Sequence, residues 1–137
     1  MRIFLDTNVL LDVLGRREPH FVAASQIWSR VEQKALDGDI SAISFNNVHY
    51  VLRRAAGRET ARDGLKLLRG LFRIVALDEQ IIHRSMDSEF ADFEDAIQFF
   101  SAHRAGADFI LTRNVRHFPD RPISVLTPEL FLKTEPA

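Results

Sequence analysis

Three acidic side chains occur within four consecutive positions in the second half of the chain, at Asp92, Glu94 and Asp95. Asp92 and Asp95 are three residues apart, so on a helix they are neighbours on one side. Two carboxylates in this arrangement can share one cation, and Mg²⁺ or Mn²⁺ prefers oxygen ligands together with retained waters. Carboxylates also gather at helix starts, where the helix dipole favours negative charge. The cluster therefore predicts a metal site, and an ordinary helix start is the alternative.

A further acid, Asp6, stands directly after the apolar run Arg2-Ile3-Phe4-Leu5, which has the length and composition of a buried strand. A carboxylate at the end of a buried strand is costly unless it is paired or bound to a metal. The alternative is a helix cap, because Asp, Thr and Asn favour turns and helix starts. We therefore expect Asp6 to be a metal ligand.

The elements that must position these acids follow from the pattern of apolar residues. Short apolar runs predict five strands, over residues 2–5, 40–44, 74–77, 109–111 and 123–126. Apolar residues at intervals of three and four, bounded by Gly, Pro and capping residues, predict a helix after Asp6 and further helices over residues 19–38, 46–57, 60–71, 79–86, 92–106 and from 127 onward. In the helix that starts near Asp92, we expect an apolar stripe formed by Phe93, Ala96, Ile97 and Phe100.

Strands that alternate with helices imply parallel pairing with right-handed crossovers. The predicted fold class is α/β, a three-layer α/β/α sandwich around a central, mostly parallel sheet. In such sheets the ligand site lies beyond the carboxyl ends of the strands. This rule places Asp6, the residues after Ser44, and Thr112-Arg113-Asn114 in one neighbourhood.

Composition limits the other possibilities. A chain of 137 residues with 46% hydrophobic content suits one domain, and the balance of 18 Lys and Arg against 19 Asp and Glu provides no overall field that attracts nucleic acid. The absence of cysteine excludes disulfides, thiolate catalysis and cysteine-based zinc sites. The sequence has neither the pattern of a signal peptide nor an apolar run long enough to span a membrane, so we expect a cytoplasmic protein.

Charge is nevertheless distributed unevenly along the chain. Residues 53–73 carry seven Lys and Arg against two acids, whereas residues 78–95 carry seven acids and one Arg. This polarity fits an acidic cleft beside a basic rim that holds RNA, although a solvated helical face would have a similar composition.

Four segments together resemble PIN domains of the VapC-like type. They are FLDTNVLLD, SFNNVHYVLRR, DFEDAIQFFSAHRAGADFILTRNVRHF and VLTPELF, and they follow one another at family-like spacing from about Arg2 to about Leu132. The first segment alone is moderately specific, but its combination with DFEDAIQ and GADFILTRN is strong. The resemblance implies a single PIN domain over residues 1–137, with four carboxylates that bind one or two Mg²⁺ or Mn²⁺ ions.

Carried over position by position, the resemblance matches Asp6 to the first acid of the family and Asp95 to the acid of its central helix. The usual Glu of the second motif falls on Asn47, and a later position often held by Asp falls on Asn114. Both amides are expected in the catalytic site as neutral ligands or hydrogen-bonding groups. A neighbouring family Asp falls on His117. Asp92 is expected to hold metal or orient water, and together with Glu94 it adds negative charge near Asp95.

The activity implied is metal-assisted hydrolysis of RNA phosphodiesters, with Thr112 and Arg113 contacting phosphate. For Arg113 a surface salt bridge is the alternative. The implied context is a toxin of a toxin-antitoxin pair, with an antitoxin protein as partner and a homodimer as the typical assembly.

Other readings are weaker or non-enzymatic. A phosphatase of the haloacid type needs a second Asp where Asn8 stands, and a phospho-acceptor receiver domain needs a late Lys that is missing. A catalytically degenerate PIN fold, serving as an RNA-binding or protein-interaction module, stays open because of the two amides. We expect Asp12 and Glu129 to be capping or surface charges. The aromatic residues expected in the core or at a dimer contact are Phe21, Trp28, Phe72, Phe99 and Phe100.

Overall fold

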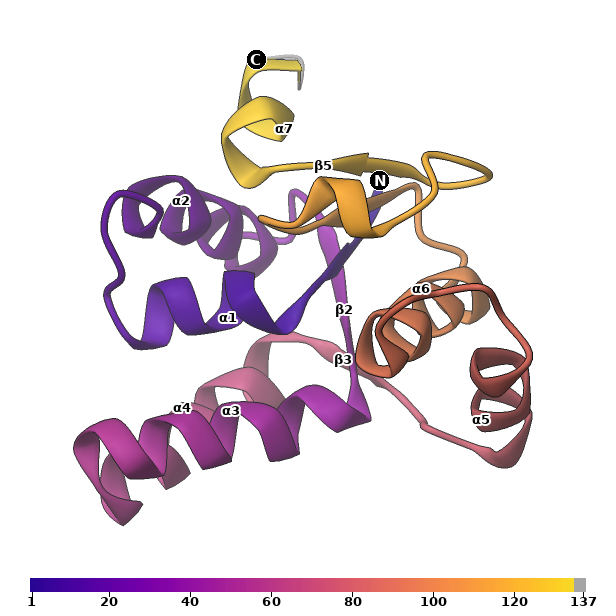
Figure 1. Ribbon diagram of the computed structural model, residues 1–137. Coiled ribbons are helices and arrows are strands. Elements are labelled where there is room, and N and C mark those ends of the chain that lie inside the picture. The colour runs from indigo at the N-terminus through magenta and orange to yellow at the C-terminus, as the bar shows by residue number, and fades with distance from the viewer. Residues whose placement is uncertain (135–137) are drawn as a thin grey trace.

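Five parallel strands form one sheet in the computed structural model, which describes residues 1–134. Their order across the sheet is β3-β2-β1-β4-β5 (Figure 1). The chain therefore adds the second and third strands on one side of the first strand, and then crosses to its other side and adds the fourth and fifth. The strands are β1 (Arg2–Leu5), β2 (Asp37–Ser41), β3 (Arg73–Val75), β4 (Phe109–Leu111) and β5 (Ser124–Leu126).

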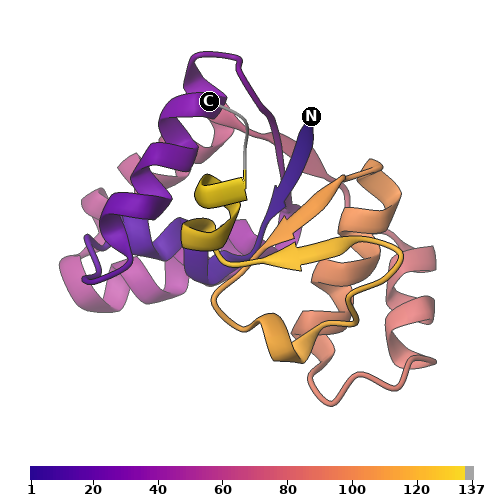
Figure 2. The same ribbon diagram turned by 90° about the horizontal axis from the view of Figure 1, so that it is seen from above.

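Helices cover both faces of this sheet, which confirms the three-layer α/β/α architecture. One face packs against α1 (Thr7–Leu14), α2 (Phe21–Glu32), α3 (Ala42–Ala56), α4 (Arg58–Leu71) and α7 (Pro128–Thr134). The other face is covered by α6 (Phe93–Ala105), against which α5 (Glu79–Met86) packs. Figures 1 and 2 agree in showing α1 to α4 on one side of the strands and α5 and α6 on the other.

The short strand β1 contributes to both layers because successive side chains of a strand point to opposite faces. Ile3 and Leu5 pack with the cluster under α1 to α4, and Phe4 packs with the cluster under α6. All three are fully buried. A central strand of a parallel sheet is covered on both faces, which is why its sequence is continuously apolar.

The second strand differs from the prediction. It runs over Asp37–Ser41 rather than residues 40–44, and Gly38 lies within it instead of ending a helix. A Cβ at Gly38 would lie 2.9 Å from the ring of Phe72, so the glycine permits close packing. Asp39 is fully buried but forms ion pairs with Arg2 at 3.0 Å and Arg73 at 2.9 Å. These long-range pairs offset the cost of a buried charge in a strand.

The helix that carries the acidic cluster has the expected boundaries. Asp92 caps α6 by accepting a hydrogen bond from the Asp95 backbone N–H at 3.0 Å, and Gly106 ends it with φ 72°. The predicted boundaries of α5 and β4 are also confirmed. Phe93 is a correction: it is 48% exposed and does not belong to the apolar stripe.

No helix within residues 1–134 is both long and apolar enough to cross a membrane.

Candidate active site

The candidate site lies where the order of the strands reverses. β1 pairs with β4 so that Leu5 is opposite Leu111, and the next residue of each strand is Asp6 and Thr112. The Asp6 backbone N–H donates to the Leu111 carbonyl at 3.0 Å. The carboxyl ends of strands at such a reversal are the usual ligand site of an open α/β sheet.

Asp6 is held by two short hydrogen bonds from different parts of the chain. Its carboxylate accepts from the Thr7 backbone N–H at 2.7 Å, as the cap of α1, and from the Thr112 hydroxyl at 2.8 Å. Asp6 is therefore a helix cap, as the alternative interpretation held, and also a buried carboxylate, since it is only 3% exposed. Its role as a metal ligand stays a prediction. Burial, followed by the charge of Glu94, raises the pKa of Asp6 to about 7.

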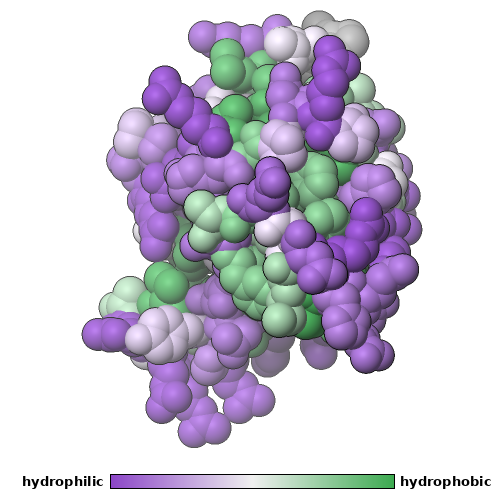
Figure 3. Space-filling model, turned by 45° about the vertical axis from the view of Figure 1, so that its right-hand side comes forward, coloured by the Kyte–Doolittle hydropathy of each residue, from purple (hydrophilic) through white to green (hydrophobic). Residues whose placement is uncertain are grey.

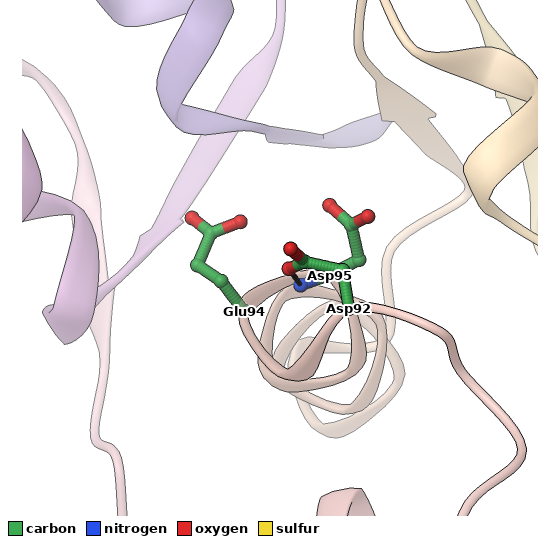
Figure 4. Close-up of side chains that lie close together, drawn as sticks. All are labelled: Asp92, Glu94 and Asp95. Carbon is green, nitrogen blue, oxygen red and sulfur yellow. Dashed lines mark hydrogen bonds between the residues drawn. The ribbon is translucent and has the colours of Figure 1, made fainter.

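The three acids at the start of α6 lie close together (Figure 4). Each of Asp92, Glu94 and Asp95 offers a carboxylate oxygen within 4.8 Å of the others. Asp92 is exposed and Asp95 is buried. Burial raises the pKa of Asp95, and the charges of Asp92 and Glu94 raise it further. A 3.0 Å hydrogen bond with His117 Nδ1 acts in the opposite direction and orients the Asp95 carboxylate.

Glu94 is fixed through one of its two oxygens. Oε2 accepts hydrogen bonds from Gln98 at 2.9 Å, Asn47 at 3.2 Å and the Thr7 hydroxyl at 3.3 Å. Oε1 has no hydrogen-bond partner within residues 1–134. In Figure 4 the Glu94 side chain extends away from those of Asp92 and Asp95 and toward the neighbouring elements. One oxygen is thus available for a ligand while the other is held by three donors.

Four carboxylates within the described residues are buried, and they fall into two groups. Asp39 is paired with two arginines, and Asp12 lies 2.9 Å from Arg113 Nε. Asp6 and Asp95 have no Lys or Arg partner in residues 1–134. The expectation that Asp12 is a surface or capping charge is therefore wrong, because its side chain is completely inaccessible. Glu129 is a partly exposed charge near His20, as expected.

This donor set fits a divalent cation. Asp92, Glu94 and Asp95 supply carboxylate oxygens, which Mg²⁺ and Mn²⁺ prefer. Asp6 lies close enough for the charges of Glu94 and Asp95 to raise its pKa. Buried carboxylates without a basic partner are costly until a cation neutralises them. The geometry therefore suits a hard divalent metal that retains some of its waters.

The other predicted site residues differ in their relation to the acids: some form hydrogen bonds with them, and others do not contact them. Asn47 joins the site through Glu94. Asn114 is exposed, and in the described part of the chain its amide side chain has no partner. Thr112 is fully buried and holds Asp6, so direct contact of its hydroxyl with phosphate does not fit the structure. Arg113 forms an ion pair with Asp12, although its side chain is 31% exposed.

The site also contains polar residues that the sequence interpretation did not assign. Gln98 is fully buried and donates to Glu94, Thr7 and the Ser44 hydroxyl. Asn8 donates to Asp6 at 3.4 Å and to Thr112 at 3.3 Å. The detectable signal was Gln98 itself, because a glutamine inside an otherwise apolar helical stripe requires buried partners.

Comparisons with known proteins agree with this geometry. A family model described as "PIN domain" matches residues 2–116. The chain is 25% identical over 135 residues to "Ribonuclease VapC1" of Aquifex aeolicus, covering 95% of this chain and 92% of that protein. A solved toxin-antitoxin complex from Klebsiella pneumoniae is similar with a TM-score of 0.68 and 25% identity, covering 92% of this chain and 97% of that one. The VapBC2 complex from Rickettsia felis bound to promoter DNA shares the fold, with a TM-score of 0.71, 13% identity and coverage of 93% and 98%.

Proposed function

This chain belongs to the PIN domain family, and we propose on that basis that it is a metal-dependent ribonuclease and the toxin of a toxin-antitoxin pair. The observation that carries the proposal is the contrast among its buried acids. Asp39 and Asp12 are neutralised by arginines, whereas Asp6 and Asp95 are buried without such a partner, and the charge of Asp95 contributes to the raised pKa of Asp6. The similarity to a ribonuclease over almost the whole chain supports the activity.

The residues of the chain have separate tasks in this mechanism. Asp6, Glu94 and Asp95 would hold Mg²⁺ or Mn²⁺, with Asp92 at the exposed side. When bound, the cation polarises the scissile phosphate and activates water for in-line attack. Thr112 orients the Asp6 carboxylate through its 2.8 Å hydrogen bond. We therefore assign Thr112 to positioning rather than to phosphate contact.

Four side chains complete the site around these ligands. His117 orients Asp95 at 3.0 Å, and the Asn47 amide orients Glu94 at 3.2 Å. Arg113 contacts the phosphate through the exposed part of its guanidinium, while Asp12 fixes its position. Asn114 is exposed beside the end of β4 and takes part by hydrogen bonding to the substrate.

The partners in this proposal are RNA, an antitoxin and a second copy of the chain. The similar toxin-antitoxin complex supports the antitoxin. A hollow of about 380 Å³ lined by Phe21, Trp28 and Leu67 between α2 and α4 offers an apolar surface for it. For the homodimer, Met86 and Phe93 are exposed on α5 and α6, and Figure 3 shows apolar surface on the side where these helices come forward.

Cleavage of single-stranded RNA, measured with Mn²⁺ and with a chelator, tests the proposal. We expect cleavage by the wild type with Mn²⁺ only, and its loss in Asp6→Asn and Asp95→Asn. Asp63→Asn, on the exposed surface of α4, is the matched control and should remain active. A folded wild type that binds Mn²⁺ but cleaves no RNA would favour the degenerate module instead.

A further inference from the structure

We propose that a pocket beside Asp95 receives one nucleobase of the RNA, next to the phosphate held in the acidic site. The inference rests on the proposed function and extends it to how the substrate is recognised. The pocket has a volume of about 660 Å³. It lies between the loop that joins α5 to α6 and the segment that follows β4, and Asp92 and Asp95 form part of its wall. It therefore opens directly onto the acidic cluster.

The pocket has aromatic and apolar walls. Phe90 packs against Phe99 with ring centroids 5.4 Å apart and lies 6.2 Å from Phe118. Phe118 is buried, but Phe90 is only half-buried, so part of its ring remains available. Phe90, Phe118 and Pro119 all line the pocket. Flat aromatic side chains that are fixed from behind are suitable surfaces for stacking a base.

The charges around the pocket select the base rather than the phosphate. The carboxylates of Glu89, Asp92 and Asp95 outnumber the one guanidinium in its lining, that of Arg116, and this excess of negative charge repels the RNA backbone. A nucleobase is neutral and can enter such a pocket. A phosphate is tolerated only at the metal site, where a cation neutralises the carboxylates. Entry of the base while the phosphate stays at Asp95 is therefore the arrangement that the charges favour.

Two side chains at the pocket can read the edge of the base. Arg116 and Glu89 line it, and neither has an ion-pair partner in residues 1–134. A guanidinium donates to the paired acceptors of guanine, and a carboxylate accepts from the exocyclic amino groups of bases. Arg116 and Glu89 are thus the residues that determine which base is preferred.

The test measures binding of nucleoside 5′-monophosphates and ribose 5-phosphate by calorimetry. These ligands contain no phosphodiester bond, so binding is measured without cleavage. We expect the wild type with Mn²⁺ to bind at least one nucleotide about tenfold more tightly than ribose 5-phosphate, because a stacked base contributes about 5- to 150-fold. Phe90→Leu and Arg116→Gln should each reduce this ratio to about threefold or less without changing Mn²⁺ affinity.

Phe93→Leu and Arg121→Gln are the matched controls, because both residues are exposed and lie outside this pocket. Melting temperatures verify that each variant is folded. The proposal is overturned if all nucleotides bind no more tightly than ribose 5-phosphate, which is the result expected if a protein segment occupies the pocket. It is also overturned if Phe90→Leu changes the affinity ratio no more than Phe93→Leu does. The same series is repeated without Mn²⁺. If a nucleotide still binds more tightly than ribose 5-phosphate there, the result supports the pocket even if the acidic site proves not to bind metal.

Discussion

At the level of single residues, Asp6 shows how burial prepares a carboxylate for a cation. Its pKa of about 7 lies well above the ordinary value of 3.8, because burial and the charge of Glu94 both disfavour ionisation. The folded protein therefore holds this proton more tightly than the unfolded chain does. Without metal, the contribution of Asp6 to stability is fully present below about pH 4 and is lost as pH rises through about 7, a loss on the order of 4 kcal/mol.

Asp6→Asn removes this cost together with the metal ligand. We expect the metal-free variant to melt several degrees above the wild type at pH 8 and close to it at pH 4.5, where the wild-type carboxyl is protonated in the fold. Mn²⁺ should stabilise the wild type at pH 8 but have little effect on Asp6→Asn. Thermal denaturation at both pH values, with and without Mn²⁺, measures this. The prediction is contradicted if, without metal, the melting temperatures of the wild type and Asp6→Asn differ by the same amount at both pH values.

Glu94 supplies a carboxylate beside position 47, where this chain has the amide of Asn47. The resemblance to VapC-like domains predicts an acid at position 47, but the amide there donates to Glu94 on the facing helix. Glu94→Gln should weaken Mn²⁺ binding at least about tenfold, since even outer residues of metal sites contribute that much. The double variant Asn47→Glu with Glu94→Gln returns the acid to α3 and should recover most of the affinity.

Calorimetric titration of Mn²⁺ into both variants measures these affinities, with Glu59→Gln as a control for losing a remote, exposed acid. Asn47→Glu alone places two carboxylates in contact, so we expect it to lower the stability of the metal-free protein at neutral pH. Equal Mn²⁺ affinity of Glu94→Gln and the wild type would remove Glu94 from the site.

Residue types revealed part of this site before the structure did. Asp6 is predictable as an unusual acid because a carboxylate directly after a buried strand requires a partner. Asp95 is distinguished from an ordinary charge at a helix start only by the resemblance to PIN domains. Thr112 lies in the predicted neighbourhood, but a hydroxyl at a strand end can bind either phosphate or a carboxylate, so its contact with Asp6 does not follow from the sequence. The orientation of Glu94 depends on Gln98 and Thr7, which come together only in the folded protein.

At the level of elements, β2 shows why some boundaries could not be predicted. Asp39 disfavours a strand on its own, and its two arginine partners are 37 and 34 positions away. A glycine such as Gly38 is typical of a helix end, but in this strand it makes room for the ring of Phe72. Strands such as Phe109–Leu111 were predictable because their apolar pattern needs no distant partner.

The ion pair between Asp12 and Arg113 connects α1 to the segment after β4. Burial raises the pKa of Asp12, and the Arg113 charge opposes that rise. Arg113→Met should destabilise the protein by on the order of 3 kcal/mol at pH 8, because it leaves a buried carboxylate without its partner. The loss should shrink toward pH 4, where Asp12 becomes protonated.

Urea denaturation at both pH values measures this loss, with Arg116→Met as the matched control from the same segment. Adding Asp12→Asn to Arg113→Met should restore most of the stability. If Arg113→Met is as stable as the control at pH 8, the pair contributes nothing to stability, and Asp12 must be satisfied in another way.

At the level of the whole molecule, a net charge of −1 conceals a strongly basic region. Two adjoining hollows of about 290 and 470 Å³ on α3 and α4 share Arg62 and Leu65. Five cations and no acid line them, and none of these cations has an ion-pair partner in residues 1–134: Arg53, Arg58, Arg62, Lys66 and Arg69. The structure thus gathers on one hairpin the positive charge that RNA requires.

Replacing Arg53, Arg58 and Arg62 by Gln should weaken binding of single-stranded RNA and reduce its dependence on salt. Each phosphate contact on a single strand contributes about 0.7 to the slope of log affinity against log salt, so the slope should fall by about 2. Fluorescence anisotropy over a range of salt concentrations measures it. The control is a variant in which Lys34, Arg84 and Lys133 are replaced by Gln in the same way. An equal change of the salt slope in that variant would indicate a general charge effect.

The hydrogen bond from Thr112 to Asp6 joins residues that are 106 positions apart in the chain. During translation Asp6 leaves the ribosome well before Glu94, Asp95 and Thr112 do. A nascent chain that has not reached Thr112 therefore lacks the hydroxyl that orients Asp6, and one that has not reached Glu94 also lacks the acids at the start of α6. An RNA-cleaving site assembled in this order is absent until these residues have been made, so the machinery that makes the protein is not exposed to the site before then.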